Sequence, residues 1–283
     1  MRNDNLGDRM KTYENVTRTY LTRRTPVIIR IDGKAFRSFT KGFEKPFDNV
    51  LVEAMQQTMK YLCENIESCV LGYTQSDEIT LVLCDYKKLT SQAWFDNNIQ
   101  KICSVSASMA TMTFNRYFEE IAQKWEDAEF SKIPIEGTEA TDRVQEEKWY
   151  KYSSAHNTAV VKGAMFDSRV FNIPKEEVNN CLLWRQQDAT RNSIQAVAQA
   201  NFSHKQLEGK NCNELQEMLR QEKDINWNDY PTHLKRGSCC VKSTYTLEVD
   251  GKDVQRSEWV IDNKIPIFSQ NTWYVNGRIT FDE

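Results

Sequence analysis

The chain has 283 residues, of which 40% are hydrophobic and 27% charged, a composition that suits one large globular domain or two modest ones. Its net charge of -3 predicts no affinity of the whole molecule for polyanions, although a local basic groove can still bind phosphates. No stretch approaches the roughly 20 apolar residues of a membrane span, and the N-terminal residues lack the apolar run of a signal peptide. We therefore expect a cytoplasmic protein without a membrane anchor.

The eight cysteines include no Cys-x-x-Cys pair, and the two nearest, Cys239 and Cys240, are adjacent. This spacing suits neither a zinc site nor a simple disulfide and predicts reduced thiols. The three histidines, His156, His204 and His233, are too scattered to predict a site.

The first predicted element is a buried strand over Thr25–Ile31, which is rich in β-branched residues and is followed by Asp-Gly. Apolar residues at helical spacing predict a helix over Asn49–Ile66. Two strands, Cys69–Tyr73 and Ile79–Leu83, are expected to form a hairpin through the short polar link Thr74–Glu78.

A second long helix is predicted over Trp94–Phe118, followed by a charged, solvated stretch over Ala122–Glu147. Strand-like character returns over Ala159–Val170, before Asn172-Ile173-Pro174 breaks it. The order strand, helix, hairpin, helix, strand predicts an α+β, ferredoxin-like (βαββαβ) fold.

Three further elements are predicted beyond this unit. Lys175–Ala200 is helical and rich in glutamine, and Asn213–Glu222 is a short amphipathic helix. The tail over Gly237–Ile279 alternates like β-hairpins, and Asn276-Gly277 is a strong turn signal. We predict a catalytic domain with inserted helices over residues 1–204 and a C-terminal extension over residues 205–283, which need not fold independently.

Three carboxylates lie at the ends of predicted strands. Asp32 ends the first strand, whereas Asp77 and Glu78 lie at the hairpin tip. Neighbouring strands of such a sheet bring these acids together, and two close acids repel unless a cation lies between them. Carboxylates and substrate phosphates are the ligands of Mg²⁺, and two such ions can assist an in-line displacement. Because successive strand residues point to opposite faces, we predict Asp77 as a ligand and Glu78 as an indirect catalytic group.

The residues after Asp32 favour phosphate binding. Gly33 allows close approach of the backbone, and Lys34, Arg37, Lys41 and Lys45 form a basic cluster. Together they are typical of a nucleoside triphosphate site. Each motif alone is also typical of a solvent-exposed turn, so the prediction depends on their pairing at neighbouring strand ends.

Four segments in order resemble the histidine-tRNA guanylyltransferase family. The similarity covers about residues 7–237, and its four blocks are Arg30-Ile31-Asp32-Gly33-Lys34-Ala35-Phe36, Gly72-Tyr73-Thr74-Gln75-Ser76-Asp77-Glu78, Phe166-Asp167-Ser168-Arg169-Val170 and Trp184-Arg185-Gln186-Gln187-Asp188. This resemblance implies a palm like that of ordinary polymerases and a Mg²⁺-dependent nucleotidyltransferase that extends tRNA at its 5′ end, in the 3′-to-5′ direction, with GTP and ATP as substrates.

Carried over by position, the resemblance implies that Asp32, the Gly33 carbonyl and Asp77 bind two magnesium ions. It also implies a nucleotide site lined by Asp32, Gly33, Lys34, Ala35, Phe36, Arg37, Lys45, Ser76 and Asp77. Candidate RNA contacts are Arg30, Trp184, Arg185 and Asn192, because an aromatic side chain can stack on bases. A homotetramer is expected, since relatives assemble as tetramers.

One block departs from the family pattern. The histidine-tRNA-specific enzymes have His-Ile-Asn-Asn where this chain has Thr190-Arg191-Asn192-Ser193, and the basic cluster expected after Trp94-Phe95 is replaced by Asp96-Asn97-Asn98. The first difference favours the guanylyltransferase-like branch, which repairs 5′-truncated tRNAs by templated addition; the second leaves the pocket for the activating nucleotide unplaced.

Three alternative functions remain open from the sequence. A strict histidine-tRNA guanylyltransferase shares the same motifs, and a nucleotidyl cyclase can use the same palm and metal pair. A non-enzymatic RNA-binding module gains nothing from clustered acids that face a polyanion.

Overall fold

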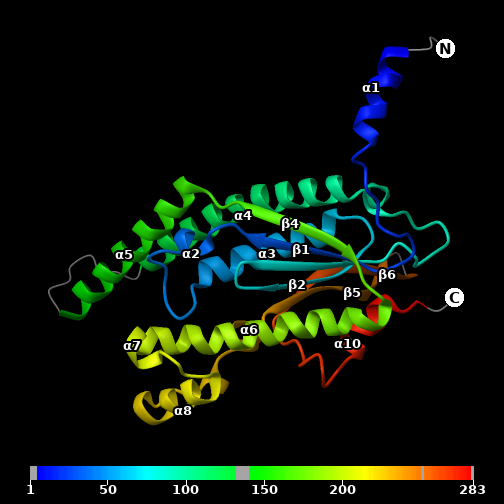
Figure 1. Ribbon diagram of the computed structural model, residues 1–283. Coiled ribbons are helices and arrows are strands. Elements are labelled where there is room, and N and C mark those ends of the chain that lie inside the picture. Colours follow the sequence, from blue (N-terminus) through cyan, green and yellow to red (C-terminus); the bar gives the residue numbers. More distant parts are fainter. Residues whose placement is uncertain (1–4, 132–139, 250–251, 282–283) are drawn as a thin grey trace.

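The computed structural model describes residues 5–131, 140–249 and 252–281, which form helices on both faces of a six-stranded antiparallel sheet (Figure 1). The strand order is β4-β1-β3-β2-β5-β6, and every neighbouring pair is antiparallel. The first four strands therefore have the predicted ferredoxin-like arrangement. The strands are β1 (Val27–Gly33), β2 (Cys69–Gln75), β3 (Glu78–Leu83), β4 (Phe166–Asn172), β5 (Ser238–Val249) and β6 (Lys252–Asp262).

One face of the sheet is covered by α3 (Asn49–Asn65) and α4 (Ile99–Phe130). Alternate residues of β1 point to opposite faces, as strand geometry requires. Ile29 and Ile31 pack in the cluster that contains α3 and α4, whereas Ile28 packs in the cluster on the other face. The uninterrupted apolar run of β1 is thus explained by burial on both faces.

The other face is covered by α6 (Val178–Asn201) and α10 (Trp273–Ile279). A third apolar cluster joins α6 to α8 (Cys212–Lys223). The remaining helices are α1 (Asn5–Asn15), α2 (Phe36–Phe39), α5 (Ala140–Lys162), α7 (His204–Leu207), α9 (Thr232–Arg236) and the 3-10 turns Trp94–Asn97, Lys175–Glu177 and Trp227–Asp229.

Several sequence predictions are confirmed. The helix predicted over Asn49–Ile66 is α3, those over Lys175–Ala200 and Asn213–Glu222 are α6 and α8, and the predicted hairpin is β2–β3. Its link is shorter than expected, because both strands continue until only Ser76 and Asp77 lie between them. All eight cysteines are free, and no described helix is long and apolar enough to cross a membrane.

The region between the second helix and β4 was predicted wrongly. The helix begins later, at Ile99, and continues to Phe130 because Phe118, Ile121 and Ala122 extend its buried stripe. Much of the charged stretch is therefore helical, in α4 and α5, with residues 132–139 outside the described part. Ala159–Val170 is not one strand, since α5 runs to Lys162 and ends at Gly163, whose φ of 68° suits glycine.

The turn predicted at Asn276-Gly277 is also wrong, because both residues lie inside α10. This helix buries Val275 and Ile279 one turn apart against the α6 face of the sheet. A Cβ on Gly277 would lie 2.9 Å from the indole of Trp273, so glycine here allows side-chain packing rather than a turn. The predicted β-hairpin of the tail is confirmed as β5–β6.

Candidate active site

The strand end and the hairpin tip that carry the predicted catalytic acids lie side by side. Asp32 pairs with Glu78 in the β1–β3 register, and the Gly33 amide donates a hydrogen bond of 3.0 Å to the Asp77 carbonyl. Ser76 has a φ of 51°, which a two-residue hairpin turn requires, and its hydroxyl donates to Oδ1 of Asp77 at 3.0 Å. The predicted juxtaposition of these residues is confirmed.

Asp77 lies in surroundings that disfavour its charged form. Burial raises the pKa of its carboxyl, hydrogen bonds from its own amide and from Ser76 lower it in part, and the negative charge of Asp32 raises it further. A cation between the two carboxylates would reverse the repulsive contribution. The electrostatics of this pair therefore suit a bound divalent ion.

Glu78 is buried and faces α6. Nε of Arg185 donates to its Oε1 at 2.7 Å, and Nη2 of Arg185 donates to Asp188 at 2.8 Å. Burial raises the pKa of Glu78, whereas the hydrogen bond and charge of Arg185 lower it. As cross-strand partners, Asp32 and Glu78 share one face of the sheet, so Arg185 offsets a negative charge beside Asp32.

Gly33 is required by the packing of the neighbouring aromatic cluster. A Cβ at this position would lie 2.2 Å from the ring of Phe36, which contacts Phe39, Phe114 and Phe166 at centroid distances of 5.0 to 5.6 Å. The cluster anchors α2 against the strand end. It holds the backbone that follows Asp32 in a fixed position.

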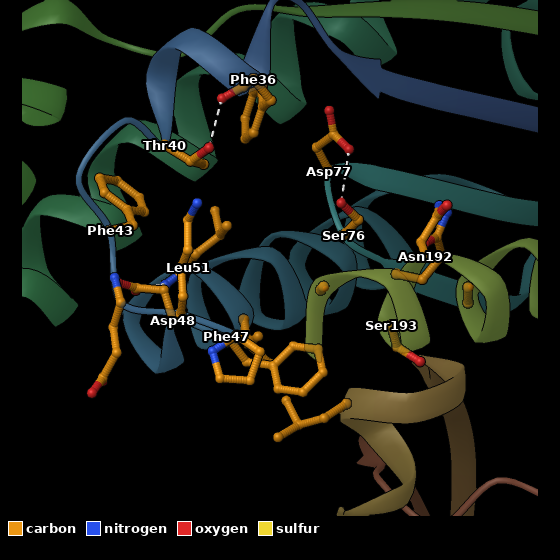
Figure 2. Close-up of a pocket in the computed structure, with 18 of the residues that line it drawn as sticks. Phe36, Thr40, Phe43, Phe47, Asp48, Leu51, Ser76, Asp77, Asn192 and Ser193 are labelled. Carbon is orange, nitrogen blue, oxygen red and sulfur yellow. Dashed lines mark hydrogen bonds between the residues drawn. The ribbon is translucent and has the colours of Figure 1, made fainter. Parts of the chain in front are cut away.

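A cavity of about 520 Å³ opens beside the hairpin tip. Figure 2 shows Ser76 and Asp77 on one side of it, Phe43 and Leu51 across from them, and Asn192 entering from α6. The predicted nucleotide-binding residues that line it are Phe36, Arg37, Lys45, Ser76 and Asp77.

Four other predicted nucleotide-binding residues, Asp32, Gly33, Lys34 and Ala35, are not among the residues that line the cavity. Asp32 and Gly33 adjoin it through the hydrogen bond between Gly33 and Asp77. Lys34 and Ala35 lie in the turn between β1 and α2.

Sequence reasoning missed the part of this cavity that comes from later in the chain. Ala189 and Ser193 of α6, and His233 and Leu234 of α9, close its far wall. Ser193 lies in the block that departs from the family pattern, but Ala189, His233 and Leu234 belong to no motif, so only the packing of α6 and α9 against the sheet could reveal them.

Asp48 is another missed residue and is held in a buried polar contact. It caps α3 by accepting from the Leu51 amide at 3.0 Å, and it lines the cavity. His156 of α5 places Nε2 2.9 Å from Oδ2 of Asp48, and both side chains are almost fully buried. The place of Asp48 directly before the helix predicted from Asn49 was a capping signal in the sequence.

The candidate RNA contacts lie on or beside α6. Trp184 is half-exposed, with the guanidinium groups of Arg30 and Arg185 over its ring at 5.5 and 4.5 Å. Arg185 is buried in its ion pairs with Glu78 and Asp188, whereas Asn192 lines the cavity. Trp184 and Asn192 are therefore the more accessible of the four.

The donor groups around Asp32 and Asp77 fit magnesium. They are carboxylate oxygens and a backbone carbonyl, which are the ligands that Mg²⁺ prefers in proteins. Within the described residues, no group of three or more His, Cys, Asp or Glu side chains could hold a metal by itself. Mg²⁺ takes one or two carboxylates from a protein and the rest of its ligands from substrate phosphates and water.

Comparison with known proteins agrees with this geometry. A family model described as tRNAHis guanylyltransferase matches residues 7–174 of the chain. The chain is 43% identical to a bacterial tRNA(HIS) guanylyltransferase (Thg1)-like protein in complex with ATP, with a TM-score of 0.77 and coverage of 98% of this chain and 100% of that one.

Two further relatives are similar along most of their length. A structure described as a bacterial Thg1-like protein in complex with GTP is 40% identical, with a TM-score of 0.73 and coverage of 98% and 100%. The tRNA(His) guanylyltransferase of Schizosaccharomyces pombe is 24% identical over 86% of this chain and 83% of its own. The similarity thus extends well past the region that the family model matches.

Proposed function

The chain belongs to the tRNAHis guanylyltransferase family, and from this premise we propose that it extends tRNA at the 5′ end by templated addition of nucleotides, typically from GTP. It is a nucleotidyltransferase that acts in the 3′-to-5′ direction. The observation that carries the proposal is the pairing of Asp32 with the hairpin tip at Asp77, beside a cavity lined by Arg37 and Lys45.

Asp32, the Gly33 carbonyl and Asp77 are the groups that would hold two magnesium ions. When bound, magnesium supplies charge neutralisation of phosphates and a lowered pKa for an attacking hydroxyl. Glu78, tied to Arg185, acts indirectly by holding its strand end and the local charge in place.

The chain's own residues bind and orient the nucleotide. Arg37 and Lys45 bring positive charge to its phosphates, and the apolar side chains of Phe43 and Leu51 suit a base. The RNA 5′ end is activated as an adenylylated monophosphate or carries a triphosphate. The 3′-hydroxyl of the incoming nucleotide then attacks the 5′ phosphorus and loses its proton to solvent. A P–O bond forms while the bond to AMP or pyrophosphate breaks, and that group leaves with the electron pair.

We favour the branch that repairs truncated tRNAs over strict addition to histidine tRNA. Thr190 stands where the histidine-tRNA-specific enzymes have histidine, and this block lies on α6, where Ala189, Asn192 and Ser193 line the cavity. Trp184 and Asn192 are the proposed RNA contacts. On the basis of this substrate we propose a cytoplasmic location.

The test uses a 5′-monophosphorylated tRNA that lacks its first nucleotide, with magnesium, GTP and ATP. Wild type should extend it with the template-matched nucleotide, and Asp32→Asn or Asp77→Asn should lower the rate by at least about 100-fold, because each loses metal-ion stabilisation of several kcal/mol. Asp253→Asn, at an exposed site on β6, is the matched control.

Each other outcome assigns a different function. Extension of intact histidine tRNA alone would identify the strict enzyme, and a cyclic product from GTP without RNA would identify a cyclase. RNA binding without any reaction, unchanged in Asp77→Asn, would identify a binding module.

Removal of magnesium with a chelator should abolish extension.

A homotetramer is the proposed assembly, on the resemblance to the family. Light scattering at micromolar concentration should give the mass of four chains. A monomer under these conditions would contradict this part of the proposal without affecting the proposed chemistry.

A further inference from the structure

A second cavity, of about 860 Å³, adjoins the nucleotide cavity between the segment after α2 and the C-terminal end of α6. Arg37, Thr40 and Lys45 line both cavities, so the two meet along these side chains. We call this second cavity the basic groove. The side chains used below to argue its chemistry are Arg37, Lys41, Lys45, Gln195, Gln199 and Lys210.

The groove concentrates positive charge in an acidic chain. Four of its lining residues are Lys or Arg and one, Glu208, is acidic, which gives a local charge of +3 in a chain of net charge -3. Within the described residues, none of these four cationic side chains has an ion pair or a hydrogen bond. Gathered cations without acidic partners are the electrostatic signature of a polyanion site.

The groove is less suited to a magnesium-bound triphosphate. Among the described residues that line the groove, Glu208 is the only acidic one, whereas a metal-bound triphosphate uses a pair such as Asp32 and Asp77. Of the described residues that line it, Phe202 is buried with Lys223 over its ring at 5.4 Å, and the exposed His204 has the one ring open to a base.

The wall contributed by α6 suits a sugar–phosphate chain. Gln195 and Gln199 are one helical turn apart, are exposed, and both line the groove. Their amides can donate to phosphate oxygens and can both donate to and accept from ribose hydroxyls. Lys41 and Lys210 come from the segments that follow α2 and α7, so donors from three segments of the chain line the groove.

We propose that the basic groove binds the sugar–phosphate backbone of the RNA strand whose 5′ end is extended. This inference rests on the proposed function. The phosphate that is attacked must lie at Asp32 and Asp77, and the strand attached to it can leave past Arg37 and Lys45 into the groove. The groove would then hold the nucleotides that follow the 5′ end.

The test is a double charge reversal, Lys41→Glu with Lys210→Glu, at two exposed positions outside the nucleotide cavity. The KM for the truncated tRNA should rise about tenfold or more at low salt, and the slope of its salt dependence should fall by about two. The KM for GTP and kcat should stay within about twofold, because Lys41, although predicted in the basic cluster after Asp32, does not line the nucleotide cavity, and neither does Lys210.

The matched control is Lys87→Glu with Lys88→Glu, at exposed positions after β3 and at the opposite end of the sheet from Asp77. It makes the same change in net charge and should leave the KM for RNA nearly unchanged. Circular dichroism and thermal melting of both variants check that they fold. If the reversed variant does not fold, Lys41→Gln with Lys210→Gln replaces it.

A second measurement locates the contact. Uncharged methylphosphonate linkages next to the RNA 5′ end should weaken binding to wild type but have a smaller effect on the groove variant, because the contact has already been lost. Binding of the labelled RNA is measured directly, so this readout does not require extension.

An unchanged KM and unchanged binding of RNA in the groove variant would overturn the inference. So would a raised KM for GTP or ATP with RNA unaffected, since the groove would then serve a triphosphate. Failure of wild type to extend any RNA would instead count against the proposed function, and the binding measurement would still decide whether the groove holds RNA.

Discussion

Among single residues, the buried ion pair between Arg185 and Glu78 has the clearest structural consequence. It joins α6 to the strand that follows Asp77, and both side chains are about nine-tenths buried. Removing one partner of such a pair leaves an uncompensated charge in a poorly solvated place, which costs far more than the pair itself contributes.

Arg185→Met should therefore lower the free energy of unfolding by about 3 kcal/mol or more at neutral pH. Urea unfolding measures this change. The double variant Arg185→Met with Glu78→Gln should recover much of the loss, because it removes the unpaired charge. Equal stability of the single and double variants would contradict this account.

His233 lines the nucleotide cavity, and burial lowers its pKa below the usual 6.5. The unfolded chain therefore takes up a proton before the folded protein does. The contribution of neutral His233 to the free energy of unfolding is fully present above pH 6.5 and is lost as the pH falls through the lowered pKa of the folded state.

His233→Gln should consequently show a smaller drop in its urea midpoint than wild type between pH 7.5 and pH 5.5. The carboxylates titrate in both proteins, so the difference between the two drops isolates His233. Drops of the same size would mean that burial does not hold this imidazole neutral.

At the scale of elements, α6 connects the site to the rest of the fold. Successive turns of this helix provide Arg185 to the acids, Ala189 and Ser193 to the nucleotide cavity, and Gln195 and Gln199 to the basic groove. The helix α8 packs against the C-terminal half of α6 through a separate apolar cluster and holds it in place. The position of α6 on the sheet therefore decides the shape of both cavities.

The contact between α3 and β2 is so close that adding one methyl group at Gly72 should destabilise it. A Cβ on Gly72 would lie 2.5 Å from Sγ of Cys63 and 2.9 Å from Cγ of Met59, so Gly72→Ala should destabilise the protein by about 1–3 kcal/mol. Adding Cys63→Ala removes the nearest atom and should recover part of the loss in a double-mutant cycle. Additive effects of the two changes would show that the clash lies elsewhere.

At the scale of the whole molecule, one sheet unites the early and late parts of the chain. β5 pairs with β2, Cys240 packs in the cluster of α3 and α4, and the cluster on the other face includes Ile28 and Ile279. The division into residues 1–204 and 205–283 remains a prediction, and shared cores of this kind favour cooperative unfolding.

Calorimetry should accordingly show a single transition, and a chain that ends at residue 204 should fail to give a cooperative one, because it lacks β5 and α10. Two separate transitions in the full chain would instead support an independent C-terminal extension.

The sequence by itself determined the elements whose patterns are local. The β-branched run of β1, the helical spacing in α3 and the polar link of β2–β3 predicted those elements, and their order predicted the fold. It also placed Asp32 beside Asp77, because strand pairing in this fold leaves one arrangement for them. Local patterns failed where tertiary packing extended or replaced them, at the end of α4, in α5 and at Gly277.

Only the tertiary structure decided what surrounds the two acids. The partner of Glu78, the helix that closes the nucleotide cavity and the cations that meet in the basic groove come from segments more than 100 residues apart. No periodicity or motif encodes such contacts, because they depend on how α6, α7 and α9 pack against the rest of the fold. The types of side chain available for catalysis could be identified from the sequence, whereas the arrangement of those side chains around the site depends on the packed fold.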